Sequence, residues 1–168
     1  IKYSFEISIS SKEQFSPKLL KTGKVSLYEQ TDFRNMDFSL LKEVSFATID
    51  VSFISVIKLL DSLKRVPKLQ EIVLLIKPQF ECGKTVADRF KGIVLDEKVH
   101  IHVIEKVTSA FEGKEFYLQN LTFSPIRGGS GNIEYLAYFT KDENKDFNDP
   151  VSVVKEAFHF FHIKKKKN

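Results

Sequence analysis

The sequence has a single cysteine, Cys82, and no tryptophan. One cysteine cannot form an internal disulfide, which excludes a small secreted scaffold held together by such bonds. No run of residues has the length and apolarity of a membrane span, and no segment has the layout of a signal peptide. We therefore expect a cytoplasmic protein without stable membrane association.

An excess of charge is also nearly absent. The net charge of +4 owes much to the run Lys164–Lys167, so composition supports a polyanionic partner only weakly. With 168 residues and 42% hydrophobic content, the chain can bury the core of one domain. We assign residues 1–163 to that domain and 164–168 to a basic tail. Because the chain begins at Ile1, we expect that a longer protein has been cut, processed or only partly represented.

Apolar runs alternate with segments of helical periodicity along most of the chain. Strands are predicted at 3–9, 25–29, 46–50, 72–76, 116–123 and 132–139. Helices are predicted at 12–20 (or a loop there), at 54–63, from Asp96 to near Gly113, and at 151–162. Only a glycine-rich connection separates the last two strands, so they should pair antiparallel. The pattern predicts an α/β, Rossmann-like sheet that is mostly parallel and ends in an antiparallel hairpin.

Charged residues follow two of the predicted strands at the point where each ends. Asp50 ends one apolar run, and Lys77 comes directly after the next. Neighbouring parallel strands bring the residues at their carboxyl ends to one crevice, where ligands bind in open α/β sheets. We therefore expect Asp50 and Lys77 to meet, although an ordinary ion pair would satisfy the same pattern. The long polar segment Cys82–Asp96 follows at the same edge and is predicted to be a binding loop.

Four blocks of the sequence, in register over roughly residues 24 to 140, resemble one family. The blocks are Ile49–Ser55, Ile76–Glu81, the segment from Lys91 through Asp96 to His100, and Ser124–Tyr135. They resemble the TlyA-type family, which is named for haemolysin and is related to FtsJ-like ribosomal RNA 2′-O-methyltransferases.

The resemblance implies methyl transfer from S-adenosylmethionine to a ribose 2′-hydroxyl of RNA, with a Lys-Asp-Lys-Glu tetrad at the crevice. Asp50, Lys77 and Glu134 match its second, third and fourth members. A ribose hydroxyl is a weak nucleophile, so Lys77 would act as general base while Asp50 and Glu134 orient it. The cations Lys84, Arg89 and Lys91 of the predicted binding loop would contact RNA phosphates.

The resemblance also implies residues for the cofactor. By position, Glu6, Asp32 and Asp50 are the acidic candidates, and Phe33 would border the adenine ring. The family's glycine-rich first strand and loop, the first lysine of the tetrad and an N-terminal RNA-binding module have no counterpart in the sequence. That strand would stand between the strands at 3–9 and 46–50. Its loss would open a gap in the core, so we expect either a fragment whose sheet is truncated at its N-terminus or a chain that fills the gap in another way.

Two other functions remain open. The missing glycine-rich segment would suit a non-catalytic RNA-binding remnant of the fold, and the haemolysin name would suit a membrane-active helix at Val151–Ile163 followed by the lysine run.

His100 and His102 have no cysteine or second carboxylate at ligand spacing, so we expect no metal site. Phe53 and Phe80, beside the predicted site, could stack on a base.

Overall fold

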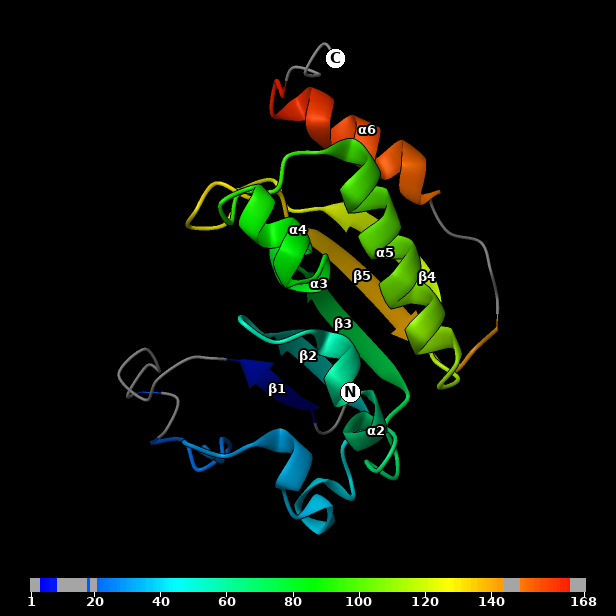
Figure 1. Ribbon diagram of the computed structural model, residues 1–168. Coiled ribbons are helices and arrows are strands. Elements are labelled where there is room, and N and C mark those ends of the chain that lie inside the picture. Colours follow the sequence, from blue (N-terminus) through cyan, green and yellow to red (C-terminus); the bar gives the residue numbers. More distant parts are fainter. Residues whose placement is uncertain (1–3, 9–17, 19–20, 144–148, 164–168) are drawn as a thin grey trace.

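A five-stranded sheet in the order β1-β2-β3-β5-β4 forms the centre of the computed structural model, which describes residues 4–8, 18, 21–143 and 149–163 (Figure 1). The strands are β1 (Ser4–Ser8), β2 (Phe46–Asp50), β3 (Glu71–Ile76), β4 (Tyr117–Phe123) and β5 (Tyr135–Thr140). The first three run parallel, and β5 runs antiparallel to both of its neighbours, β3 and β4. This confirms a mostly parallel sheet with a terminal antiparallel hairpin.

The first strand fills the expected gap, which is the second of the two alternatives. β1 pairs directly with β2, from Ser4 opposite Phe46 to Ser8 opposite Asp50, so no gap separates them. Backbone groups along the edge of β2 would lack partners if that position stayed empty. β1 supplies those partners, and the core is continuous there: Phe5 and Ile7 pack against it.

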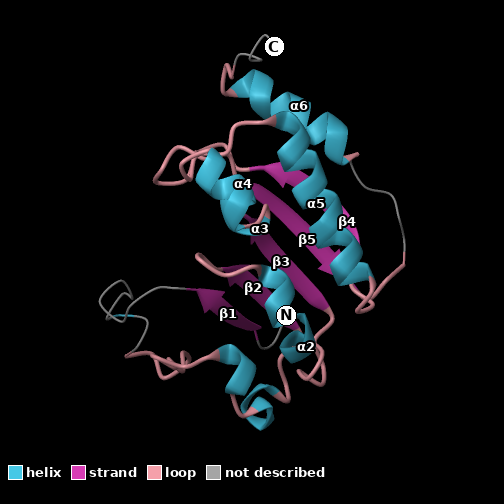
Figure 2. Ribbon diagram, viewed as in Figure 1, coloured by secondary structure: helices cyan, strands magenta, loops and turns pink. Residues whose placement is uncertain are grey.

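In Figure 2 the helix α5 (Glu97–Glu112) lies over one face of the sheet. The other helices are the 3₁₀ helices η2 (Phe33–Asn35), η3 (Phe38–Leu41) and η4 (Val56–Leu59), and the α-helices α2 (Leu60–Leu63), α3 (Pro78–Glu81), α4 (Lys84–Arg89) and α6 (Pro150–Phe160). α5 contacts α3, η4 and β4, and α6 packs on α5 and β4. The core lies between these helices and the alternate strand residues that face them.

The two long helices show why their sequences fold as predicted. The Asp96 carboxylate accepts the N–H groups of Lys98 and Val99 at 2.9 and 3.3 Å, and α5 ends at Gly113. In α6 four apolar residues are buried in the core, Val153, Val154, Ala157 and Phe158, whereas Phe160 is 52% exposed. The side of α6 that suggested a membrane-active helix therefore packs inside the protein. Among the described residues, no helix combines the length and apolarity that crossing a membrane requires.

Four local expectations are wrong. Residues 25–29 form no strand, and the helix expected at 54–63 is a 3₁₀ turn followed by one short α-turn. The segment Cys82–Asp96 is not wholly loop, because Gly83, with a φ of 85°, turns the chain into α4. β5 begins at Tyr135, so residues 132–134 precede it. The helix expected at 12–20 lies outside the described residues except for Lys18.

Candidate active site

Strand direction brings three charged residues to one edge of the sheet. Asp50 is the last residue of β2, and Lys77 follows the last residue of β3. Glu134 precedes β5, whose first residue, Tyr135, pairs with Ile76 at the end of β3. Because β5 runs antiparallel to β3, its amino end meets the carboxyl ends of β2 and β3. We call this the carboxyl edge.

Lys77 is held by two oxygen atoms. Its Nζ lies 2.5 Å from Oδ1 of Asp50 and donates to Oγ of Ser52 at 3.0 Å. The Lys77 side chain is 12% exposed, whereas that of Asp50 is 52% exposed. The predicted meeting of Asp50 and Lys77 is therefore confirmed. The amine is largely withdrawn from water, and its carboxylate partner is open to a ligand.

Glu134 lies within electrostatic reach of this pair. Burial raises the pKa of the Glu134 carboxyl above its usual value, and the positive charge of Lys77 partly opposes that rise. The Gln79 amide donates to Oε1 of Glu134 over a long 3.4 Å. A Cβ atom at Gly128 would lie 2.9 Å from Cδ of Glu134, so the glycine leaves the space that the carboxyl group occupies.

A second, buried carboxylate joins the two loops that leave β2 and β3. Glu81 ends α3 and is 4% exposed. Its Oε2 accepts the Ser55 hydroxyl at 2.6 Å, and its Oε1 accepts the N–H of Val56 at 2.8 Å.

Between Ser52 and Ser55, Phe53 has a φ of 63° and an 87% exposed side chain. Its ring touches that of Phe80, with centroids 5.0 Å apart.

A buried polar network supports the carboxyl edge from behind. The Asn132 side chain accepts the N–H of Val94 and donates to the carbonyl of Gly92, both at 2.9 Å. His100 bonds through Nε2 to the Val94 carbonyl and through Nδ1 to the Tyr135 hydroxyl, both at 2.7 Å. Burial lowers the pKa of His100 to about 4, so the ring is neutral at pH 7. A carbonyl only accepts, so Nε2 carries the proton and Nδ1 accepts from Tyr135.

The predicted phosphate contacts lie on the surface beyond Glu81. Lys84 and Arg89 belong to α4, Lys91 follows it, and all three side chains are exposed. The Arg89 guanidinium lies 4.9 Å from the ring centroid of Phe90. A short helix thus presents two of these cations, and their contact with RNA stays a prediction.

The other cofactor candidates lie apart from the cluster. Glu6 is in the middle of β1, two residues before its carboxyl end. Both oxygens of Asp32 bond to Arg34, the closest at 2.6 Å, and these bonds lower the pKa of Asp32 to about 2. Phe33 is buried and stacks on Phe5 at 5.5 Å. In this arrangement the Asp32 carboxylate is paired with Arg34 and the Phe33 ring is covered, so neither is free to bind S-adenosylmethionine. Their cofactor role stays a prediction.

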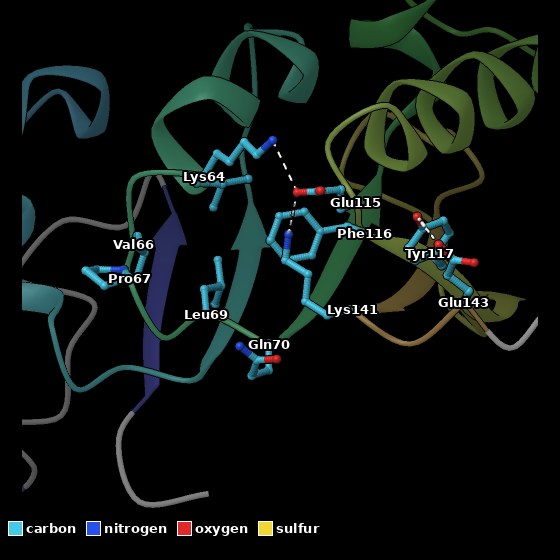
Figure 3. Close-up of a pocket in the computed structure, with 11 residues that line it drawn as sticks. Lys64, Val66, Pro67, Leu69, Gln70, Glu115, Phe116, Tyr117, Lys141 and Glu143 are labelled. Carbon is cyan, nitrogen blue, oxygen red and sulfur yellow. Dashed lines mark hydrogen bonds and ion pairs between the residues drawn. The ribbon is translucent and has the colours of Figure 1, made fainter.

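A cavity of about 470 Å³ lies at the opposite edge of the sheet (Figure 3). Gln70 precedes β3 and Lys141 follows β5, which places the cavity at the amino ends of the parallel strands. In Figure 3, Lys64 and Lys141 both point at Glu115, with nitrogen–oxygen distances of 3.2 and 3.9 Å. We call this the amino edge. It does not include Asp50, Lys77 or Glu134.

Sequence reasoning missed the residues that support the three charges: Ser52, Ser55, Gln79, Glu81 and Gly128. Glu81 carried a usable signal, because an acidic residue one helical turn after Lys77 can reach back to the neighbouring loop. The role of Gly128 carried none, since it depends on where the Glu134 side chain points.

The family model described as FtsJ-like methyltransferase matches residues 7–141. YqxC of Bacillus subtilis, whose name gives it as a candidate rRNA methyltransferase, is 39% identical over 142 residues, which are 82% of this chain and 49% of YqxC. The 23S rRNA (cytidine-2′-O)-methyltransferase TlyA of Campylobacter jejuni is 38% identical over 129 residues, 77% of this chain and 50% of that protein. The chain thus spans about half the length of these relatives.

Solved structures agree with the fold. The crystal structure of a candidate hemolysin from Lactococcus lactis superposes with a TM-score of 0.80 at 35% identity. The superposition covers 92% of this chain and 76% of that one.

Proposed function

The chain belongs to the FtsJ-like methyltransferase family, and on this premise we propose that it methylates ribose 2′-hydroxyls of RNA, with S-adenosylmethionine as the methyl donor. Ribosomal RNA is the proposed substrate, because the C. jejuni relative is named for cytidine 2′-O-methylation of 23S rRNA. One observation carries the proposal: a largely buried lysine lies 2.5 Å from a half-exposed carboxylate at the carboxyl edge, with Glu134 beside them.

Lys77 is the general base in this proposal. The proton of the ribose hydroxyl passes to Nζ of Lys77 as the oxygen forms its new bond to carbon. When bound, S-adenosylmethionine would supply the methyl group and leave as the neutral thioether, and the half-exposed Asp50 carboxylate is the residue of this edge proposed to hold it. Asp50 and Ser52 hold the amine in place, because Nζ lies 2.5 Å from the Asp50 carboxylate and donates to the Ser52 hydroxyl at 3.0 Å. Glu134, whose carboxyl group lies within electrostatic reach of Lys77, orients the hydroxyl in this proposal.

The RNA would approach across the exposed residues around this cluster. Lys84, Arg89 and Lys91 are the proposed phosphate contacts, and such contacts position a nucleic acid without reading its sequence. Phe53 is the proposed base contact. Phe53 follows Ser52, which accepts a hydrogen bond from Lys77, and its ring is 87% exposed. Exposed aromatic rings can stack on unpaired bases.

A second candidate function is RNA binding without methyl transfer. The observation that favours it is the engagement of Asp32 by Arg34 and of Phe33 by the core. Calorimetry with S-adenosylmethionine on the full-length protein, as its gene encodes it, separates the two functions. Heat of binding at micromolar cofactor supports the methyltransferase, and no heat at millimolar cofactor supports the RNA-binding protein.

The function is tested by identifying the product. Ribosomal RNA is incubated with the full-length protein and labelled S-adenosylmethionine, digested to nucleosides and analysed by mass spectrometry. We expect a ribose-methylated nucleoside, and roughly 10²-fold less of it with Glu134→Gln. Glu115→Gln, at the amino edge, is the matched control and should match the wild type. Methyl groups on bases only, or no product from a protein that binds the cofactor, would contradict the proposal.

A further inference from the structure

The Glu81 carboxylate is buried, does not touch Lys77 or Asp50, and has no part in the proton transfer proposed above. We propose that Glu81 is a positioning residue, which holds the loops after β2 and β3 in the arrangement that places Ser52 and Asp50 against Lys77. The proposal rests on the proposed function, because it assigns Glu81 an effect on the same site.

The connectivity gives Glu81 this leverage. Asp50 and Lys77 each begin a loop, and Glu81 closes the short helix that starts directly after Lys77. Its two oxygens accept from Ser55 and Val56, where the other loop ends and η4 begins. Its backbone carbonyl accepts from Nζ of Lys106 at 3.1 Å, which ties the same residue to α5. One side chain therefore fixes the far ends of both loops.

The loop held in this way is strained. Phe53 adopts the left-handed backbone region, which is strained for a non-glycine residue, and its side chain is mostly exposed. Fixed contacts flank it, from Ser52 to Lys77 and from Ser55 to Glu81. Without Glu81 the loop can relax. The Ser52 hydroxyl then moves from the Lys77 amine, which keeps only its contact with Asp50.

The chemistry at this position requires a polar side chain that can bond both to the Ser55 hydroxyl and to the N–H of Val56. An apolar side chain would leave the N–H of Val56 buried without a partner. Glutamine can keep the geometry, because its carbonyl oxygen accepts from Val56 and its amide donates to the Ser55 hydroxyl. Glu81→Gln and Glu81→Ala are thus a matched pair that differ in whether the two loops stay joined.

The first test is kinetic. Glu81→Ala should lower kcat for RNA methylation roughly 10–10²-fold, as expected when catalytic groups move by about 1 Å, with KM for RNA within about twofold of the wild type. Glu81→Gln should restore kcat to within a few-fold. Activities are compared at a temperature where circular dichroism shows both variants folded. A kcat for Glu81→Ala equal to that of the wild type, or an equal loss in Glu81→Gln, would overturn the proposal.

The second test does not depend on methyl transfer. Limited acylation of lysines, read by mass spectrometry, reports the accessibility of the Lys77 amine relative to Lys114, which pairs with Asp61 elsewhere. We expect Lys77 to react several-fold faster in Glu81→Ala and in Ser55→Ala. Ser55→Ala removes one of the two hydrogen bonds that the Glu81 carboxylate accepts. It is the variant to use if Glu81→Ala does not fold. Unchanged acylation of Lys77 would refute the positioning role. If the wild type has no methyltransferase activity, the proposed function is refuted. The acylation result alone then decides whether Glu81 positions Lys77.

Discussion

The two edges of the sheet both place lysines against carboxylates, yet they differ in how those side chains are held. At the amino edge, Lys64 and Lys141 share Glu115, and the three side chains are 49%, 29% and 65% exposed. At the carboxyl edge, Lys77 is 12% exposed and bonds to both Asp50 and Ser52. Exposed ion pairs contribute about 0–1 kcal/mol. The comparison teaches that anchoring at strand ends and burial of the lysine, rather than residue type, distinguish the carboxyl edge from a surface ion pair.

The largest contrast is expected from removing the carboxylate at each edge. Asp50→Asn takes away the carboxylate that holds Nζ of Lys77 in place, so methyl transfer should fall roughly 10²-fold. Asp61→Asn removes an equally short ion pair, to Lys114, and should leave the rate unchanged. Single-turnover methylation of RNA by the two variants measures both. Equal rates of methylation by Asp50→Asn and Asp61→Asn would show that the ion pair at the carboxyl edge matters no more than the surface ion pair.

Acid should weaken the support of the carboxyl edge. The pKa of His100 is about 4 in the folded chain and near 6.5 when unfolded, so the unfolded state binds more protons between these values. Stability should therefore fall as the pH drops from about 6.5 to 4, by about 3 kcal/mol in total. Urea unfolding at several pH values measures this. His100→Asn should flatten the slope, whereas His102→Asn, on the exposed side of α5, should keep it.

Salt should act on RNA binding through the cations near the carboxyl edge. Replacing Lys84, Arg89 and Lys91 with glutamine should weaken RNA binding roughly 10–10²-fold at 0.1 M salt and lower the salt slope by about two to three. The matched control replaces Lys64, Lys68 and Lys114, which pair with carboxylates near the amino edge. Fluorescence anisotropy over a salt series reads both sets. An unchanged slope in the first set would rule out the phosphate contacts.

The smallest expected effect comes from one methyl group. Gly128→Ala places Cβ against the Glu134 carboxyl group, which must turn away, so methyl transfer should fall roughly threefold to tenfold with little change in melting temperature. Gly129→Ala adds the same atom where no other atom lies within 4 Å. A Gly128 variant with the activity of the Gly129 variant would show that the position of Glu134 is not critical.

The sequence predicted the main geometry because parallel strands leave little choice. Asp50 and Lys77 follow neighbouring strands, and a reversed β5 had to bring Glu134 to the same edge. The sheet and the pairing of its last two strands followed from alternating patterns and a connection too short for a crossover. Strand direction and the length of a connection can both be inferred from a single sequence, which is why these features were predicted.

The errors arose where partners decide the structure. Residues 25–29 have strand-forming side chains, but no neighbouring strand pairs with them. The predicted gap closed because β1 pairs with the free edge of β2. Ser52 and Glu81 escaped notice because their roles depend on side-chain directions across 25 residues of sequence, which no local pattern encodes.

Replacement of Lys77 by arginine tests the central claim most directly, that the lysine at the carboxyl edge takes the proton from the ribose hydroxyl. Arginine keeps the positive charge near Asp50 but cannot release a proton near neutral pH. Lys77→Arg in the full-length protein should bind the cofactor as the wild type does and transfer methyl groups roughly 10²–10⁴-fold more slowly, whereas Lys114→Arg should be unaffected. Near-normal turnover by Lys77→Arg would contradict the account and leave Lys77 an electrostatic role only.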